Sequence, residues 1–303
     1  MLRGTVLGIA NRPWVRKVAT GGLGRRVALR FVAGETLDDA IEVIARLNGM
    51  GASVSIDYLG ENVADPSQAR AAADVYREAI ERIAGRGLDA DVSVKLTQLG
   101  LDVDPSLAYT NAESVVARAA VAGTAVTLDM EDHRSTDRTV DAALRLSGAH
   151  PGSIGIALQA CLKRTPRDLD RVTAAGIRVR LCKGAYKEPR ALAWQRRRRV
   201  AQAFRALTAR LLASDAYAMI ATHDEALIEH AIGEVKLRAR SRETFEFQML
   251  YGVRRELQQQ LLARGYRLRV YVPFGDQWYP YLTRRIAERP ANVRFFAEAL
   301  LRK

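Results

Sequence analysis

The chain has 303 residues, of which 48% are hydrophobic; this suits one large buried core, and the length suits a single α/β barrel of about 250 residues. Two cysteines are too few for a secreted disulfide framework, and no apolar run reaches the roughly 18–20 residues of a membrane span. The formal net charge of +13 favours anionic partners such as nucleic acid, acidic lipid or an anionic substrate, without choosing among them.

The first 50 residues precede the first predicted strand, and we expect them to form an N-terminal helical arm. Within it, residues 36–48 carry apolar side chains at helical spacing, with Thr36 placed as the N-cap. From residue 51 to 303, β-rich runs alternate with helical or loop sequence, as in parallel βαβ units. The predicted strands are 53–58, 91–96, 125–130, 153–159, 177–182, 217–222, 245–250 and 268–273. Eight such strands predict a single (β/α)8 TIM-like barrel over residues 51–303.

Polar residues gather where the predicted strands end, which is where such barrels place their active sites. The set is mixed in charge, with three cations and two carboxylates. It consists of Asp57, Lys95, Asp129, Gln159, Arg180, Lys183, Thr222, His223, Gln248 and Tyr271. His223 alone among the histidines lies securely at a strand end, so we expect no metal site.

A final helix is predicted to begin near Trp278 and to lie over the barrel mouth. Tyr281, Arg284, Arg285 and Glu288 follow at i, i+3, i+4 and i+7, so they share one helical face. Two guanidinium groups beside a tyrosine suit the binding of a small carboxylate, because arginine binds carboxylates through two parallel hydrogen bonds.

The segment Tyr271-Val272-Pro273-Phe274-Gly275, with the run from Trp278 to Asn292, resembles the C-terminal signature of the proline dehydrogenase family. Other segments similar to the family follow the same order along the chain: Asp57–Glu61, Ser93–Leu96, Leu128–Glu131, Gln159-Ala160, Arg180–Tyr186 and Ala221–His223. The length is similar to the monofunctional bacterial form. The resemblance implies FAD-dependent oxidation of L-proline to Δ1-pyrroline-5-carboxylate by hydride transfer to flavin N5. It also implies that electrons pass to a quinone, in the first step of proline catabolism to glutamate.

The resemblance further implies roles for individual residues. Asp129 and Arg180 are expected at the reacting atoms, Asp129 by hydrogen-bonding Tyr271 and Arg180 by lying along the flavin. The substrate would be bound by Lys95, Leu181, Tyr186, Leu250, Tyr271, Tyr281, Arg284 and Arg285. The cofactor would be contacted by Met130, Gln159, Arg180, Lys183, Gly184, Ala185, Thr222, His223 and Glu288. Glu61 is expected to pair with Arg284 and gate the closed site.

Alternatives to this function stay open at the level of sequence. A related flavin enzyme could oxidise hydroxyproline or another cyclic imino acid, although the bulk of Tyr271 and Tyr281 would crowd a substituted ring. A cofactor-free basic barrel could instead bind anions or membranes. We interpret Arg196–Arg199 as a solvated helix face, with a contact for acidic lipid as the second interpretation. We expect no nucleic-acid partner. The protein is expected in the cytoplasm, with peripheral contact at the inner membrane as an open question, as is its oligomeric state.

Overall fold

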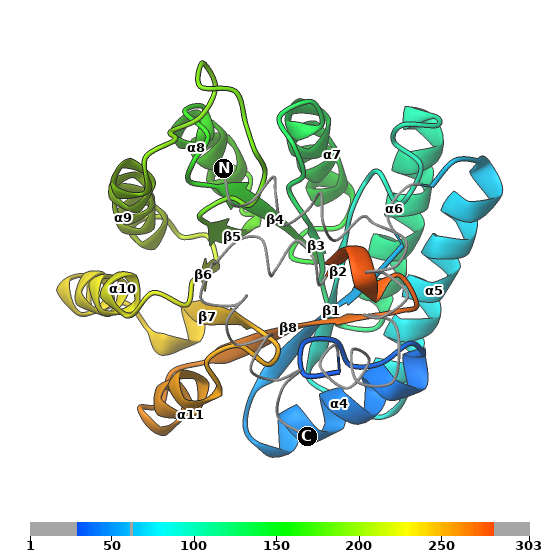
Figure 1. The fold of residues 1–303 in the computed structure, drawn as a ribbon, viewed down its shortest axis with the longest axis horizontal. Helices are drawn as coiled ribbons and strands as arrows, with labels where there is room; N and C mark the ends of the chain where they lie inside the picture. The colour runs from blue at the N-terminus through cyan, green and yellow to red at the C-terminus, as the bar shows by residue number, and fades with distance from the viewer. Residues whose placement is uncertain (1–28, 61–62, 282–303) are drawn as a thin grey trace, which may run out of the picture.

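The computed structural model describes residues 29–60 and 63–281, which form a closed parallel barrel (Figure 1). The barrel closes where β1 pairs with β8, from Ser53 beside Arg269 to Tyr58 beside Phe274. Its strands are β1 (Ser53–Tyr58), β2 (Ala90–Val94), β3 (Val126–Leu128), β4 (Ile154–Gln159), β5 (Arg178–Cys182), β6 (Ala218–Ala221), β7 (Phe245–Leu250) and β8 (Leu268–Phe274). The predicted fold class is confirmed, and each strand boundary falls within two residues of its prediction.

A ring of helices surrounds the barrel. It consists of α4 (Leu37–Gly49), α5 (Pro66–Gly85), α6 (Pro105–Val121), α7 (Thr136–Ala149), α8 (Thr165–Ala174), α9 (Arg197–Ala213), α10 (Glu225–Leu237) and α11 (Arg255–Ala263), with a short 3-10 turn at Arg242–Thr244. Strands β1 to β7 are each followed by one helix, α5 to α11. Helix α4 precedes β1, packs against β1 and β8, and so completes the ring between α11 and α5 (Figure 1).

Helix α4 is fixed at its start by a reciprocal cap and along its length by apolar burial. The Thr36 hydroxyl accepts from the backbone N–H of Asp39, while the Asp39 carboxylate accepts from the backbone N–H of Thr36 at 3.0 Å. Ile41 and Ile44 are fully buried in the main core. The expected arm of residues 1–50 is described only from residue 29, so its boundary as a separate unit stays a prediction.

The strands carry different chemistry on their two faces because successive side chains point in opposite directions. In β1, Val54 and Ile56 belong to the apolar core. Ser55 and Asp57 alternate with them; the Ser55 hydroxyl lies 3.2 Å from the Ser93 hydroxyl of β2. The layer between strands and helices is therefore apolar, while the barrel interior is polar.

Ion pairs link neighbouring helices around the outside of the ring. They join Arg82 to Asp38, Arg86 to Glu42, Arg118 to Glu81, Arg171 to Asp141, Arg210 to Asp170 and Arg264 to Glu229. Exposed pairs of this kind contribute about 0–1 kcal/mol each, so burial of the apolar core dominates the stability. Among the described residues, no helix is both long and apolar enough to cross a bilayer.

Replacing Ile44 by Ala tests whether α4 is part of the barrel core. We expect the free energy of unfolding, measured in urea, to fall by about 2–5 kcal/mol because the change leaves a cavity beneath a fully buried side chain. The control is Val121→Ala at a position that is 79% exposed, with an expected change within about 0.5 kcal/mol. Equal effects of the two substitutions would show that α4 unfolds independently of the barrel.

Candidate active site

Three side chains from separate strands meet at the barrel mouth around Asp129, which directly follows β3. One carboxylate oxygen of Asp129 accepts from the Arg180 guanidinium at 2.6 Å, and the other accepts from the Tyr271 hydroxyl at 2.6 Å. The Arg180 guanidinium carbon also lies 5.3 Å from the centre of the Tyr271 ring. Burial and the charges of Asp129 and Asp57 hold the pKa of Tyr271 well above 10.0, so its hydroxyl keeps its proton and donates. The expected hydrogen bond between Asp129 and Tyr271 is present.

A lysine joins this group from the end of β2. Lys95 Nζ donates to Asp57 Oδ1 at 2.5 Å and lies 3.9 Å from Asp129 Oδ2. Both Lys95 and Asp57 are buried. Burial raises the pKa of Asp57, and the Lys95 ammonium opposes that rise. Two carboxylates and two cations are thus packed within one small region of the mouth.

The Arg180 side chain is held in place by hydrogen bonds below the mouth. Its Nε donates to Gln248 Oε1 at 2.5 Å, and its two terminal nitrogens donate to the hydroxyls of Ser93 at 2.7 Å and Ser55 at 3.1 Å. The Gln248 amide donates in turn to Glu246 at 2.6 Å. An arginine can only donate and an ionised glutamate can only accept, so the chemistry of these neighbours fixes which way the Gln248 amide faces.

The polar side chains inside the barrel, here called the polar column, continue from Gln248 to a second buried ion pair toward the other end of the barrel. Glu246 accepts from Arg269 Nε at 2.8 Å, and Arg269 lies 3.5 Å from Asp91. Burial, the largest single effect, would raise the pKa of Glu246, but the charge and hydrogen bond of Arg269 together with the hydrogen bond from Gln248 oppose it, and the pKa is lowered. Sequence reasoning placed Gln248 at the rim without a role and did not identify Glu246 or Arg269. The signal that could have found such interior residues is a polar residue at every second position of a strand that is expected to be buried. Asp91 and Ser93 show this pattern in one strand.

The loop after β5 has a backbone that closely approaches the end of β4. Gln159 donates to the carbonyl of Glu131 at 2.8 Å and accepts from the backbone N–H of Ala185 at 3.3 Å. Gly184 has φ +104°, and a Cβ there would lie 2.3 Å from the Cys161 sulfur, so only glycine fits. Burial raises the pKa of the Cys161 thiol to about 11, which favours its protonated form at neutral pH.

Polar residues at the ends of β5 and β6 form another small group. Lys183 Nζ donates to Asp224 at 2.8 Å, and this bond lowers the pKa of Asp224. The Thr222 hydroxyl accepts from the backbone N–H of Asp224 at 3.2 Å. His223 Nε2 accepts from the backbone N–H of Leu250 at 2.9 Å, so in the neutral ring the proton is on Nδ1. Asp224 was not among the predicted site residues.

The proline dehydrogenase family model matches residues 40–298. The chain belongs to the proline dehydrogenase family. It is 39% identical over 303 residues to proline dehydrogenase 1 of Bacillus subtilis subsp. natto, with 100% of both chains covered. It is 37% identical over 306 positions to the proline dehydrogenase of Deinococcus radiodurans, covering 100% of this chain and 98% of that one.

A solved structure of proline utilization A from Bdellovibrio bacteriovorus, inactivated by N-propargylglycine, shares the fold. Its TM-score is 0.80 at 23% identity, over 86% of this chain and 32% of that one. The family match and the relatives of 37–39% identity confirm the resemblance of the sequence to the proline dehydrogenase family, and the solved structure confirms the barrel architecture.

The remaining residues predicted from the family resemblance fall into three groups. Met130 and Tyr281 are buried, and Tyr281 lies in the helical segment 278–281 that begins where predicted. Leu181 is fully buried in the apolar core, whereas Tyr186 is 38% exposed; their substrate contacts, like that of Leu250, stay predictions. Glu61, Arg284, Arg285 and Glu288 lie outside the described residues. Across the described part of the chain, no group of three or more potential metal ligands occurs.

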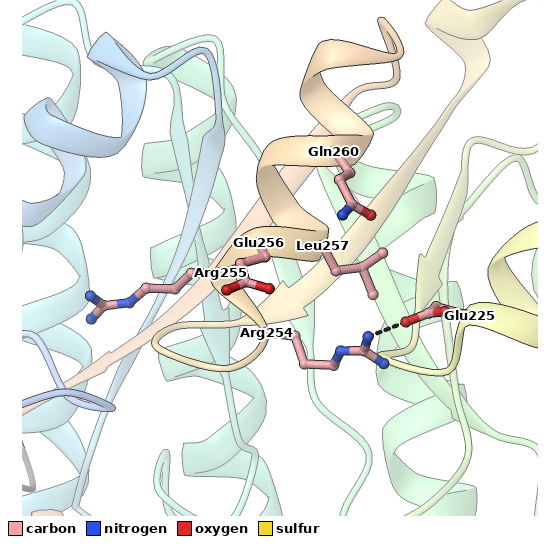
Figure 2. Close-up of a pocket in the computed structure, with 6 residues that line it drawn as sticks. All are labelled: Glu225, Arg254, Arg255, Glu256, Leu257 and Gln260. Atoms are coloured by element: carbon pink, nitrogen blue, oxygen red, sulfur yellow. Dashed lines mark hydrogen bonds and ion pairs between the residues drawn. The ribbon is translucent and has the colours of Figure 1, made fainter.

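A polar pocket of about 360 Å³ opens beside this site, between the start of α10 and the first turns of α11 (Figure 2). Arg254 pairs across it with Glu225 and donates to the carbonyl of His223 at 3.3 Å. The other lining residues are Arg255, Glu256, Leu257 and Gln260. Mixed charges in its lining suit a polar ligand better than an apolar one.

Replacing Gln248 by Met tests the link between the two ion pairs. The substitution keeps the volume but removes both hydrogen bonds to charged neighbours, and we expect the free energy of unfolding to fall by about 2–4 kcal/mol. In the control Gln258→Met, the lost bonds go to the carbonyls of Leu250 and Val253, and a loss of about 1 kcal/mol is expected. Chemical denaturation measures both, and similar losses would contradict a linking role for Gln248.

Proposed function

We propose that this protein oxidises L-proline to Δ1-pyrroline-5-carboxylate with FAD as its cofactor. Membership of the proline dehydrogenase family supports the reaction. The observation that carries the proposal is the meeting of Lys95, Asp129, Arg180 and Tyr271 at the barrel mouth. These groups offer fixed cations for a carboxylate and for developing negative charge beside a protonated hydroxyl.

The residues present fit a flavin cofactor. Lys183 and Arg180 supply cations, while Gln159, Thr222 and His223 supply hydrogen-bonding groups at neighbouring strand ends. Gly184 is exposed beside these groups, so its backbone is accessible to a cofactor. When bound, FAD would supply the two-electron acceptor for the hydride that leaves the substrate. The protein would supply binding, orientation and electrostatics.

Substrate orientation is proposed to depend on the cations at the mouth. Lys95 would bind the proline carboxylate, together with Arg284 and Arg285 as the sequence predicts. An ammonium group has three donors, so Lys95 can keep its bond to Asp57 while donating to a ligand. The Tyr271 hydroxyl is already directed to Asp129, and the ring would bound one side of the substrate pocket.

Arg180 is proposed to stabilise negative charge that develops on the reduced cofactor. Its donors are held by Asp129, Gln248 and two serines, so its position does not have to change during the reaction. Such preorganisation lowers the barrier because little reorientation is needed in the transition state. Lys183 would act on the same cofactor from the end of β5.

The wider physiological assignment is also part of the proposal. We infer that electrons pass to a quinone, that the protein is cytoplasmic with peripheral contact at the inner membrane, and that it acts first in proline catabolism to glutamate. Oxidation of hydroxyproline or another cyclic imino acid is the alternative reaction. A cofactor-free anion-binding or membrane-binding barrel is the alternative of another class.

Anaerobic titration of the purified protein with proline tests the reaction. We expect bound flavin in the visible spectrum, bleaching on addition of L-proline, and much weaker bleaching by hydroxyproline. Recovery of Δ1-pyrroline-5-carboxylate in a one-to-one ratio to reduced flavin would complete the assignment. A colourless protein that takes up no FAD would exclude this function, and preferential bleaching by hydroxyproline would favour the alternative enzyme.

Replacing Lys95 by Met tests its role in substrate binding. We expect KM for proline to rise about 10–100-fold with FAD still bound, because a hydrogen bond to a charged group contributes about 1.5–3 kcal/mol. The control Lys236→Met removes the same charge from an exposed position on α10 and should leave KM unchanged. An unchanged KM in the Lys95 variant would show that this ammonium does not bind the substrate.

A further inference from the structure

The segment of residues 187–199, called the basic loop below, leads from the rim of the barrel into α9 and includes the first turn of that helix. It contains six exposed cations, Lys187, Arg190 and Arg196–Arg199. Its single carboxylate, Glu188, is buried and lies 2.5 Å from His133 Nδ1. From this surface we propose that the basic loop docks the protein on an anionic lipid bilayer.

Among the described residues, the cations of the basic loop have no carboxylate partner, unlike several arginines on the neighbouring helices. Within the described ranges 29–60 and 63–281, none of the six forms an ion pair, and Arg199 has one long hydrogen bond of 3.4 Å to Gln202. On α9 itself, Arg210 pairs with Asp170 of α8. The charge of the basic loop is therefore not neutralised by those parts of the fold, which favours an external anion.

Helix polarity adds to the positive potential of this surface. Arg197–Arg199 form the first turn of α9, and this turn contains no acidic residue. The first turn of a helix carries a partial positive charge from its free N–H groups, so cations there are unfavourable in isolation. A negatively charged surface relieves this repulsion.

Apolar side chains in the basic loop distinguish a bilayer from nucleic acid as the partner. Leu192 and Trp194 are 43% and 42% exposed. Trp194 also lines a groove of about 190 Å³ with an apolar lining that includes Leu162, Pro166 and Leu207. Tryptophan favours the interface between headgroups and acyl chains, and basic residues favour anionic headgroups. Nucleic acid offers no apolar phase for an exposed leucine.

The backbone beneath these side chains is anchored to the barrel. Lys163 N–H donates to the carbonyl of Leu192 at 2.9 Å, and Trp194 N–H donates to the carbonyl of Cys161 at 2.8 Å. The Lys163 ammonium lies 5.2 Å from the centre of the Trp194 ring. The backbone that carries Leu192 and Trp194 is thus fixed by hydrogen bonds to the barrel. Less conformational entropy is therefore lost when these side chains enter an interface.

The basic loop begins next to Tyr186, so docking would bring the rim of the proposed active site toward the bilayer. The basic loop thus gives the proposed membrane contact a defined surface. Only the biological reason for docking, which is electron transfer to a quinone, rests on the proposed function. The physical argument from charge and exposure does not depend on the substrate. Binding can therefore be measured without proline or an electron acceptor.

Co-sedimentation of the full-length protein with lipid vesicles tests the docking surface. We expect binding to vesicles of phosphatidylcholine mixed with phosphatidylglycerol, weak binding to phosphatidylcholine alone, and release at high salt. Replacing Arg196, Arg197, Arg198 and Arg199 by Ala should lower the partition coefficient by at least about tenfold. Replacing Leu192 and Trp194 by Ser should also weaken binding, and the loss should persist at high phosphatidylglycerol content.

The matched control replaces Arg77, Arg82, Arg86 and Arg118 by Ala, which removes the same charge from α5, its C-cap and α6. This variant should bind vesicles like the wild type, and thermal unfolding should verify that every variant is folded. Equal losses in the two four-arginine variants would overturn the assignment to the basic loop. So would no binding by the wild type, or arginine-dependent binding of DNA but not of vesicles. Proline oxidation with a water-soluble dye, measured in parallel, reports separately on the proposed function.

Discussion

The site depends on the burial of one cation, Arg180, inside the barrel. A buried charge is tolerated only when its donors are satisfied, and removal of one partner leaves a large desolvation cost. The partners of Arg180 come from β1, β2, β7 and the end of β3: Ser55, Ser93, Gln248 and Asp129. The requirement to satisfy this guanidinium therefore fixes the relative positions of strands that are distant in sequence, and it orients Asp129 toward Tyr271.

The polar column and the apolar layer have separate tasks that the alternation of strand residues makes compatible. Val54 and Ile56 bury apolar surface against the helices, while Ser55 and Asp57 in the same strand face polar partners. Stability can thus come from the outer layer while the interior is built for charge. The polar interior residues fix the positions of side chains more than they raise the free energy of unfolding. The reason is that the desolvation cost of a buried ion pair often exceeds its electrostatic gain.

Sequence patterns were sufficient for the strands and the rim because both are local features. β-rich runs located every strand, and Lys95, Asp129, Arg180 and Tyr271 were recognised at strand ends. The contacts made deeper in the barrel were not foreseen, as for Glu246 with Arg269, because they depend on which inward-facing side chains meet across a closed sheet. The periodicity of a strand predicts which face a side chain occupies but not which residue it meets across the barrel. In the same way, periodicity predicted that α4 is a helix but not where it lies in the ring.

The net charge of +13 has different consequences in different parts of the molecule. Around α4 to α6, arginines such as Arg86 and Arg118 meet carboxylates of the adjacent helix, so their charges are largely compensated. In the barrel, the positive charge of Arg180 is balanced by Asp129 at the mouth, and that of Arg269 by the buried carboxylate of Glu246. In the basic loop no such balance occurs within the described residues. Since separated exposed charges are screened within about 10 Å at ordinary salt, an uncompensated cluster acts locally. The basic loop is thus a locally uncompensated positive surface, although much of the net charge of the chain belongs to residues outside the described ranges.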